Sequence, residues 1–429
     1  MRQPIEPPST IAAVPAAATH DVCSTHLLAD LKEPATIFMA KQAPHAFVSL
    51  GAPKLRSTNI WGRVSVSVSP LQTRHQRRFG AVRLRAALDL PMTLGQWVLQ
   101  QERQHPETAD LAPLITATAT AGKQIASLVA RAGVSNLTGL QGSVNVQGEE
   151  QKKLDVLTNE VLKNALRSTG KLGVLASEEE NEPVSLMEEA YTGDFIAAFD
   201  PLDGSSNLDA AIATGTIFGV MRSGEHCLTG PEDADISQRQ MQCLVQTLQP
   251  GANLVAAGYI LYSSSVIFML SIGHGVQGFS LDPAIGEFVL THPDVRVPER
   301  GKIYSFNEAN SDNWDPVLQE YIRSMKKKGY SSRYIGSLVG DVHRTLIYGG
   351  VFGYPGDKKN PNGKLRLLYE CAPMAYLMEQ AGGIATTGKQ RILDIVPRDV
   401  HQREPFICGS PRDVEDLLKI YQGSMAMRG

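Results

Sequence analysis

The sequence predicts a layered α/β fold built from two subdomains. Three observations lead to this prediction: amphipathic helical patterns open the folded part, a block of short apolar runs typical of strands follows, and helices and strands then alternate. Elements in this order bury their apolar faces by stacking helices on sheets. The chain has 429 residues, which at roughly 100–200 residues per domain corresponds to two or three domains.

The first helices are predicted from apolar residues spaced for one helical face. Thr93 is placed to cap a helix whose apolar face includes Leu94, Trp97 and Val98. Further helices are expected over 114–130, 154–166, 314–327 and 367–380. The last helix should begin after Ser410, with Pro411 at its first position.

The strands form one block in the middle of the chain. They are expected over 195–199, 216–220, 254–261, 266–272, 276–281 and 288–290, with a polar insert from about 222 to 248 between the second and third. We expect a presequence over 1–88, an N-terminal α+β subdomain over 89–295 and a C-terminal α/β subdomain over 296–424.

Composition excludes several classes of protein. The net charge of −3 argues against a nucleic-acid binder, and a hydrophobic content of 42% argues against a disordered chain. Five cysteines are too few for a disulfide scaffold. The longest uncharged apolar stretch, 256–273, contains three consecutive serines, so we interpret it as two strands around a turn and expect no membrane association.

The N-terminal segment differs in charge from the rest of the chain. Residues 1–88 hold 11 Lys and Arg against 4 Asp and Glu, and no acidic residue occurs from 34 to 88. A basic, acid-poor segment with serines is typical of an organelle transit peptide. The alternative is a disordered basic tail, and Met39 is a second candidate for the start of the presequence.

The most informative string is Asp200-Pro201-Leu202-Asp203-Gly204-Ser205-Ser206-Asn207, which follows an apolar strand. Pro201 should stop the pairing of that strand and force a turn. A tight loop can then bring the carboxylates of Asp200 and Asp203 together, and backbone amides at a following helix start favour a phosphate. Carboxylate oxygens beside a phosphate cradle indicate a Mg²⁺ site for phosphoryl chemistry.

Two other acidic segments are candidates for the same site. Glu178, Glu179 and Glu180 follow a short apolar run, where the simpler interpretation is a solvated loop. Glu370 follows a stretch in which Lys364 and Arg366 alternate with apolar residues, and alone it would be a charge partner for the start of a helix.

These segments together resemble the class I fructose-1,6-bisphosphatase family. The Asp200–Asn207 string is similar to the metal motif of the wider inositol-phosphatase superfamily, and 363–375 is similar to the family's own signature. Supporting matches lie at 303–308 and 333–346, and the resemblance covers about 90–421. Segment 146–155 and the insert before Gln249 resemble the plastid branch. The resemblance implies the layered α/β sandwich of this sugar phosphatase superfamily.

The resemblance also implies a role for each matched residue. The implied Mg²⁺ ligands are Glu178, Glu179, Asp200, the Leu202 carbonyl, Asp203 and Glu370, and the implied acids that activate water are Asp155 and Glu179. The implied substrate contacts are Asp203, Gly204, Ser205 and Ser206 at the 1-phosphate, and Asn307, Tyr334, Tyr354 and Lys364 at the sugar and the 6-phosphate. Arg333 and Arg366 are further implied substrate contacts. Glu149 and Asn310 depart from residues common in the family.

The implied activity is Mg²⁺-dependent hydrolysis of fructose 1,6-bisphosphate to fructose 6-phosphate in the plastid stroma, in the Calvin cycle and the gluconeogenic direction. Arg333 matches an arginine donated across a subunit interface, which implies a homo-oligomer, typically a tetramer. Alternatives are activity on sedoheptulose 1,7-bisphosphate or inositol phosphates, and a catalytically silent regulatory protein.

Two kinds of regulation follow from the plastid resemblance. Cys227 and Cys243 match a disulfide that thioredoxin reduces, whereas Leu248 stands where a third cysteine is usual; Cys371 and Cys408 lie in apolar contexts. Segment 107–111 and Asp194 replace the residues with which other members bind AMP, so no AMP site is expected.

Overall fold

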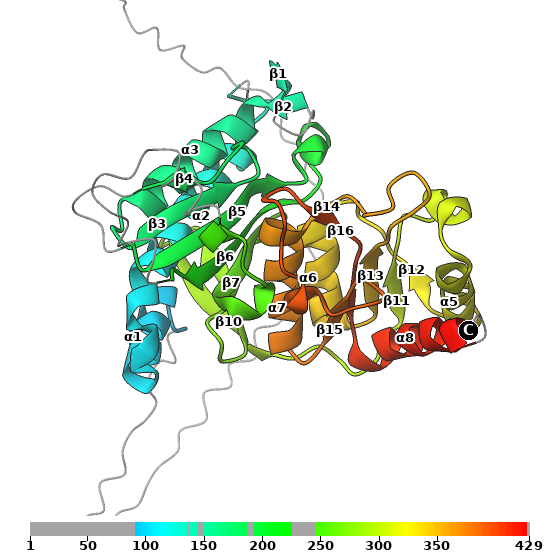
Figure 1. Ribbon diagram of the computed structural model, residues 1–429. Coiled ribbons are helices and arrows are strands. Elements are labelled where there is room, and N and C mark those ends of the chain that lie inside the picture. The colour runs from blue at the N-terminus through cyan, green and yellow to red at the C-terminus, as the bar shows by residue number, and fades with distance from the viewer. Residues whose placement is uncertain (1–90, 136, 145–149, 187–192, 225–244, 427–429) are drawn as a thin grey trace, which may run out of the picture. The chain divides into compact units, whose positions relative to one another are not determined.

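In the computed structural model, the chain folds as alternating layers of helices and sheets (Figure 1). The structure describes residues 91–135, 137–144, 150–186, 193–224 and 245–426. The proposed presequence 1–88, Glu149, Cys227 and Cys243 lie outside these residues. Within the described part of the chain, no helix is both long and apolar enough to cross a membrane.

The larger sheet has eight strands in the order β10-β9-β8-β7-β6-β5-β3-β4. The strands are β3 (Leu172–Ser177), β4 (Val184–Ser185), β5 (Phe195–Asp203), β6 (Thr214–Arg222), β7 (Leu254–Tyr262), β8 (Val266–Ser271), β9 (Val276–Asp282) and β10 (Glu287–Val295). β3 and β5 are parallel and the other neighbours are antiparallel. All six strands predicted from the sequence are present.

The second sheet has the order β12-β11-β13-β17-β15. Its strands are β11 (Ile303–Ser305), β12 (Ser331–Ser332), β13 (Val351–Tyr354), β15 (Ile384–Thr386) and β17 (Phe406–Gly409). Two small ribbons complete the strands, β1 (Leu140–Val144) with β2 (Glu150–Lys152) and β14 (Leu365–Arg366) with β16 (Arg403–Glu404).

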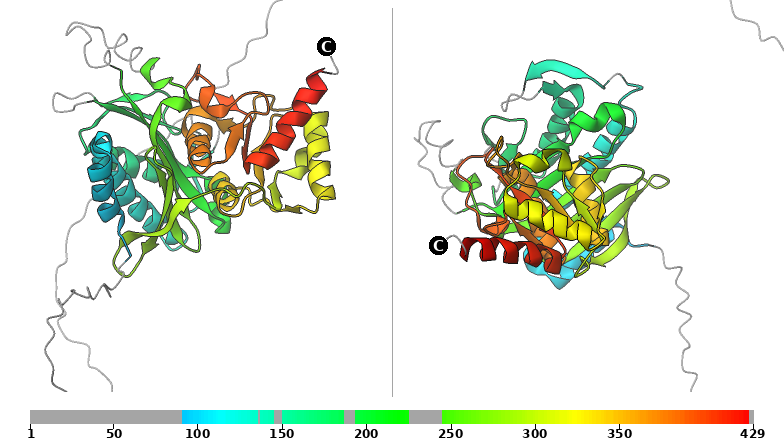
Figure 2. Two further views of the ribbon diagram at one scale, coloured as in Figure 1. Left: turned by 90° about the horizontal axis from the view of Figure 1, so that it is seen from below. Right: turned by 90° about the vertical axis from the view of Figure 1, so that its right-hand side faces the viewer.

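Helices cover the outer face of each sheet and fill the space between the sheets (Figures 1 and 2). α1 (Leu94–Gln104), α2 (Ala112–Ala130) and α3 (Lys153–Arg167) cover the larger sheet. α6 (Leu338–Tyr348) and α7 (Ala372–Gln380) lie between the sheets, and α5 (Pro316–Lys327) and α8 (Pro411–Ala426) pack side by side on the second sheet.

β5 explains why the middle of the molecule is rigid. Phe195, Ala197 and Phe199 join the apolar cluster beneath α1–α3, whereas Ile196 and Ala198 join the cluster around α6 and α7. A strand covered on both faces must be apolar at every position, which is the pattern found in its sequence. The residues that end β5 are therefore held by packing on both sides.

The helix ends follow the sequence closely, with one difference. Thr93 and Gln96 form a capping box at the start of α1. Ser410 precedes α8 as predicted, but its hydroxyl accepts a hydrogen bond from the Gly350 amide at 2.9 Å. This serine therefore ties the start of α8 to the beginning of β13.

His343 in α6 gives a prediction about stability. Its Nδ1 lies 2.8 Å from the Tyr259 hydroxyl, and burial, followed by the nearby charge of His292, lowers the pKa of His343 to about 4. Between about pH 6.5 and pH 4, His343 therefore binds a proton in the unfolded chain but not in the folded one. As the pH falls through this window, His343 should lower the free energy of unfolding by about 2–3 kcal/mol.

His343→Gln should flatten that part of the pH dependence in chemical denaturation, measured without added metal. His274→Gln, on the exposed β8–β9 turn, is the control and should keep the parent profile. Equal pH profiles for His343→Gln and the parent chain would contradict the prediction.

Candidate active site

The site is built on a bulge at the end of β5. Asp200 pairs with Ile217 and Asp203 with Gly215, so Pro201 and Leu202 oppose Thr216 alone. The strand continues through Pro201, whereas the sequence suggested that Pro201 would end the pairing. Proline donates no hydrogen bond and is accommodated at a bulge, where its carbonyl accepts from the Thr216 hydroxyl at 2.8 Å.

The bulge determines where the two aspartates point. Residues three apart in a regular strand face opposite sides, because side chains alternate. The extra residue in the bulge cancels one alternation, so Asp200 and Asp203 face the same side. Oxygens of Asp200, Asp203 and Glu370 all lie within 4.8 Å of one another, and all three residues are buried.

Glu370 reaches this point from a turn of π-helix. Residues Leu367–Cys371 form this wide turn immediately before α7, and the Arg366 amide donates to the Glu370 carboxylate. The sequence predicted a helix over 367–380, and its first five residues take the π form. Such turns occur frequently at functional sites because they redirect side chains.

The three consecutive glutamates are separated by the turn after β3. Glu178 is buried and forms an ion pair with Arg366 at 2.8 Å. Glu180 turns away, to Lys163 at 2.6 Å and Asn159 at 2.9 Å. Glu179 is half-buried between them. The segment is therefore not one solvated charge run, because Glu178 belongs to the buried carboxylates.

Asp155 lies in the first turn of α3. Its carboxylate accepts from the Lys152 amide at 2.8 Å, and its buried Oδ1 has no hydrogen-bond partner among the described residues. Burial raises the pKa of Asp155 to about 6, although the Lys152 amide and the Ser205 hydroxyl act in the opposite direction. The nearby charge of Glu178 adds to the increase, so Asp155 faces the same group of acids.

Burial is the first reason why the carboxylates of this site hold protons tightly. It raises the pKa values of Asp200, Asp203 and Glu370, and mutual repulsion with Glu178 raises them further. Arg366 and the Val339 amide, which donates to Asp203 at 3.1 Å, partly offset this effect. Val339 lies in the first turn of α6, so the positive end of that helix points at the site.

The turn after Asp203 forms a cradle of backbone amides. Gly204 has a φ of 75°, a conformation that favours glycine, and it begins the short helical turn Ser205–Ala210. Asn207 closes the turn through its amide at 2.8 Å from the Gly204 carbonyl, and its side chain donates to the Gly336 carbonyl at 2.8 Å. The turn is thereby tied to the loop before α6.

The remaining predicted substrate residues lie on loops of the second sheet. Tyr334 is 37% exposed, and its pKa rises to about 12 through burial and then through nearby Tyr354, Asp341 and Asp203. Lys364 and Arg333 are exposed, and the Arg333 carbonyl accepts from Arg344 at 2.8 Å. Asn307 is half-buried before the turn Glu308–Asn313. Tyr334 is therefore close enough to Asp203 and Tyr354 to interact with them electrostatically.

Arg366, a predicted substrate contact, lies among the carboxylates. Its guanidinium is 2.8 Å from Glu178 and 3.9 Å from Glu370. It is buried, while Lys364 two residues earlier is exposed. The alternation with apolar residues indicated a shared strand face but could not show which cation would be covered.

The sequence reasoning also missed groups that hold the site together. The Tyr369 hydroxyl forms a hydrogen bond with His401 Nδ1 at 2.8 Å, and His401 Nε2 lies 3.0 Å from the Glu180 carbonyl oxygen. These contacts join the turn of Glu178 to the chain after α7. His401 has no local sequence signal, because its partners are 32 and 221 residues away.

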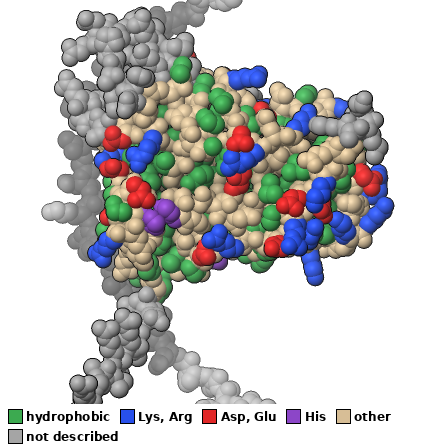
Figure 3. Space-filling view, turned by 60° about the horizontal axis from the view of Figure 1, so that its bottom comes forward, with side chains coloured by type: hydrophobic (Ala, Val, Ile, Leu, Met, Phe, Trp, Pro, Cys, Tyr) green, Lys and Arg blue, Asp and Glu red, His purple; other side chains and the backbone are tan. Residues whose placement is uncertain are grey.

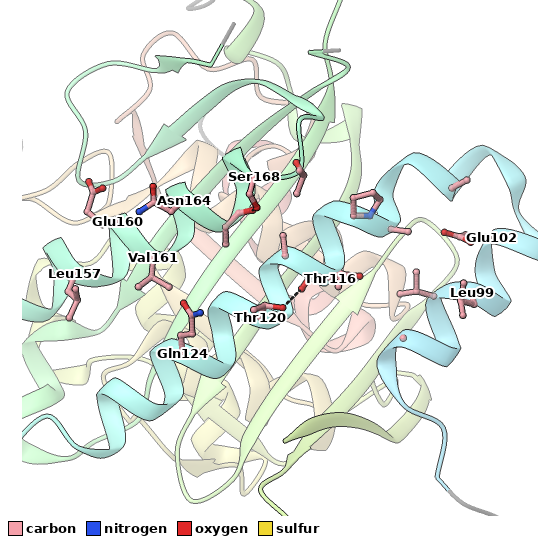
Figure 4. A pocket seen from close by; sticks show the side chains of 18 residues that line it. Leu99, Glu102, Thr116, Thr120, Gln124, Leu157, Glu160, Val161, Asn164 and Ser168 are labelled. Atoms are coloured by element: carbon pink, nitrogen blue, oxygen red, sulfur yellow. Dashed lines mark hydrogen bonds between the residues drawn. The ribbon is translucent and has the colours of Figure 1, made fainter. Parts of the chain in front are cut away.

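A large cavity among the described residues lies away from the carboxylates. It has a volume of about 960 Å³ and is lined by faces of α1, α2 and α3 (Figure 4). The charged residues among those lining it are Glu102 and Glu160. A cavity lined by acids and without Lys or Arg does not suit a phosphorylated ligand, so it does not compete with the carboxylate site.

The donor set of the carboxylate site fits a hard divalent cation. It offers buried carboxylate oxygens, including the unpartnered Oδ1 of Asp155, and no sulfur or imidazole ligand among the clustered side chains. Oxygen ligands of this kind suit Mg²⁺ and Mn²⁺. A layered α/β sandwich with such a cluster beside an amide cradle defines a metal-dependent phosphatase of the sugar phosphatase type.

Comparisons with known proteins assign the family. The family model for the N-terminal domain of fructose-1,6-bisphosphatase matches residues 92–293, and that for its C-terminal domain matches 297–422. The chain is 56% identical over 333 residues to the chloroplastic fructose-1,6-bisphosphatase of Oryza sativa subsp. indica, covering 76% of this chain and 82% of the relative. The chloroplastic enzyme of Spinacia oleracea is 56% identical over 335 residues, covering 76% and 80%.

A comparison with solved structures gives the same family. The holo crystal structure of Leishmania major fructose-1,6-bisphosphatase matches with a TM-score of 0.70 at 41% identity, covering 77% of this chain and 99% of that one. The chain belongs to the fructose-1,6-bisphosphatase family.

Glu370 gives a prediction about the metal-free protein. The pKa of Glu370 is 4.5 in the unfolded chain and about 8 in the folded protein, so folding favours its protonated form. The resulting contribution to the free energy of unfolding is fully present below about pH 4.5 and is lost as the pH rises through about 8. At neutral pH, Glu370→Gln should therefore stabilise the metal-free protein by about 1–3 kcal/mol, less than the full shift would give because the cluster shares its protons.

The melting temperature with a chelator and then with excess Mg²⁺ measures this effect. Glu370→Gln should melt higher than the parent chain in chelator and gain less from Mg²⁺. Glu287→Gln, at an exposed ion pair with Lys123, is the control and should behave like the parent. A lower melting temperature for Glu370→Gln in chelator would refute the prediction.

Proposed function

We propose that this chain hydrolyses the 1-phosphate of fructose 1,6-bisphosphate with Mg²⁺ as the cofactor. The observation that carries the proposal is the convergence of Asp200, Asp203 and Glu370 within 4.8 Å beside the amide cradle at Gly204. Family membership supports this substrate, since the relatives compared are named fructose-1,6-bisphosphatases.

The metal would be held by Glu178, Glu179, Asp200, Asp203, Glu370 and the Leu202 carbonyl. When bound, it supplies positive charge that lowers the pKa of an attacking water and stabilises the leaving oxygen. Burial on both faces of β5 keeps Asp200, Leu202 and Asp203 in place and excludes bulk water from them.

The other residues of the site bind the substrate and move a proton. Amides at Gly204, Ser205 and Ser206 hold the 1-phosphate, as backbone N–H groups at a turn favour anions. Asp155 or Glu179 accepts the proton of the attacking water, and a pKa of about 6 suits Asp155 to this task near neutral pH.

The distal end of the substrate is assigned to the loops of the second sheet. Asn307, Tyr334, Tyr354 and Lys364 bind the sugar and the 6-phosphate, and exposed Arg333 serves the site of a neighbouring subunit in a homo-oligomer, typically a tetramer. In this proposal the positive charge of Arg366 also offsets the negative charge of the metal-binding carboxylates, because Arg366 is paired with Glu178. Activity on sedoheptulose 1,7-bisphosphate is a second candidate that the same metal site would permit.

The cellular setting follows from the relatives and the N-terminal charge. The rice and spinach relatives are chloroplastic, and residues 1–88 are basic and acid-poor. We therefore assign the chain to the plastid stroma and propose that residues 1–88 direct it there. Thioredoxin is the proposed redox partner, and AMP is not a proposed effector because Asp194 and 107–111 offer acids where a phosphate would bind.

Replacement of Asp203 tests the catalytic proposal. Asp203→Asn should lower the rate of phosphate release from fructose 1,6-bisphosphate with Mg²⁺ by about 100-fold or more, because a metal ligand contributes several kcal/mol to the transition state. Asp282→Asn, at the turn after β9, is the control and should keep parent activity. Parent-like turnover by folded Asp203→Asn would remove the assignment of the metal site.

Replacement of the insert cysteines tests the redox proposal. Cys371 and Cys408 are buried, and burial raises the pKa of both thiols, which makes them unreactive. Cys227 and Cys243 lie outside the described residues, and a bond between them would contribute about 3 kcal/mol by the loop-entropy model. Oxidation should therefore lower activity, most at low Mg²⁺, and thioredoxin should restore it.

Cys227→Ser and Cys243→Ser should both remain active after oxidation, and equally so, since Leu248 removes a third partner. Activity after equilibration at fixed dithiol potentials, with peptide mapping of the oxidised chain, measures this. A mapped bond to Cys371 or Cys408 would contradict the proposal.

A further inference from the structure

A second group of potential metal ligands lies on the surface, away from the carboxylate site. His105 Nδ1 and His274 Nε2 are 3.6 Å and 3.7 Å from the same oxygen, Glu107 Oε1. Ligand atoms of the three residues all lie within 4.8 Å of one another. The two imidazole rings stack with centroids 3.6 Å apart and an interplanar angle of 16°. On the face shown in Figure 3, histidine side chains lie directly beside acidic ones.

The backbone holds these residues in place from two distant parts of the chain. His105 ends α1, its amide donates to the Gln101 carbonyl at 2.7 Å, and its carbonyl accepts from the Thr108 amide at 2.9 Å. Glu107 follows in the turn Pro106–Leu111, and its carbonyl accepts from Arg222 at 3.2 Å. The cluster therefore needs little further ordering at these positions.

His274 is presented by the turn between β8 and β9. It lies between Gly273 and Gly275, whose φ angles of 91° and 78° form a tight turn that favours glycine. The Gly275 amide donates to the Gln380 side chain at 3.0 Å, which anchors the turn to α7. The histidine is thereby held opposite the end of α1 although 169 residues separate it from His105, as the numbering shows.

The distances and donor types fit a zinc-type ion. Tetrahedral zinc with ligands at about 2.0–2.2 Å places neighbouring ligand atoms about 3.4 Å apart, close to the two separations from Glu107 Oε1. Two imidazole nitrogens and one carboxylate oxygen suit Zn²⁺, Ni²⁺ or Cu²⁺ better than Mg²⁺, which prefers an all-oxygen shell. Because the lone pair of an imidazole nitrogen lies in the plane of its ring, the two nearly parallel rings must rotate about their Cβ–Cγ bonds to bind a common ion.

We propose that His105, Glu107 and His274 form a surface binding site for a divalent transition-metal ion of the zinc type, with water at the fourth position. The side chains are 33%, 64% and 38% exposed in that order, so an ion reaches them directly from solvent. The bound ion would cross-link the end of α1 to the β8–β9 turn.

This site is distinct from the carboxylate site. Arg222, which donates to the Glu107 carbonyl, pairs with Phe195 at the beginning of β5, whereas Asp200 lies five residues further along that strand. At about 3.3 Å per residue, Phe195 and Asp200 are separated by about 16 Å along β5. None of the three ligands contacts the clustered carboxylates, so their replacement should leave the basal Mg²⁺-dependent activity unchanged.

Zinc stoichiometry of the full chain tests the proposal. Equilibrium dialysis against Zn²⁺ in excess Mg²⁺ is followed by metal analysis for the parent chain, His105→Gln, His274→Gln and Glu107→Gln. The parent should hold one more zinc equivalent than His105→Gln or His274→Gln. His292→Gln, at a half-buried histidine hydrogen-bonded to Thr291, is the matched control and should hold as much as the parent.

The melting temperature gives a second readout that does not depend on activity. Zn²⁺ should raise it more in the parent chain and in His292→Gln than in the three ligand variants. Glu107→Gln is included because this side chain is 64% exposed and pairs with the two histidines, so its replacement should leave the fold intact. Equal zinc content and equal zinc-induced stabilisation in the parent chain and Glu107→Gln and His274→Gln would overturn the proposal.

Discussion

The structure depends on keeping several carboxylates buried at one point. Asp200, Asp203, Glu178 and Glu370 are shielded from water and repel one another, and each buried charge costs several kcal/mol when it is not compensated. The surrounding groups reduce that cost in two ways. Arg366 supplies a full positive charge from within the cluster, and the first turn of α6 supplies an oriented amide at Val339.

Two local irregularities create the site, and neither is incidental. A regular strand would turn Asp200 and Asp203 to opposite faces, so the bulge at Pro201 and Leu202 is needed to bring them together. The π turn before α7 widens the helical backbone at Glu370 and so directs its carboxylate toward the two aspartates. Packing of β5 on both faces, with α7 against β6 and β7, stabilises both irregularities and prevents the carboxylates from moving apart.

β6 offers a physical route from the proposed redox insert to the metal ligands. It begins beside Asp203, through the pair of Gly215 with that residue, and ends at Arg222, shortly before the segment that contains the insert cysteines. A constraint on the insert that shifts β6 along β5 would change the register at the bulge. The bulge is sensitive to register because one residue, Thr216, opposes two. The proposed zinc site contacts the same end of β6 through Arg222. The insert and the zinc site would therefore both act on β6 at the end that is far from the carboxylates.

The sequence by itself determined the fold class, the six strands β5 to β10, and the helices α1, α2, α3, α5, α7 and α8. Apolar periodicity is local, and so are capping signals such as Thr93, which explains why these elements were predicted correctly. The sequence did not predict α6 or the strands of the second sheet. The resemblance to a family added the grouping of Glu178, Asp155 and Glu370 with the two aspartates, which lie far apart in the chain. The structure places all five in one charged environment.

Only the tertiary structure decided which way the individual side chains point. Pro201 was expected to end β5, but pairing with β6 continues past it, and the register with another strand sets the direction of Asp203. The ion pair of Arg366 with Glu178, 188 residues earlier in the chain, could not be predicted from the sequence around either residue. The pairing of His105 with His274 also has no sequence signal. In each case the deciding contact joins residues distant in sequence, and local propensity contains no information about such contacts.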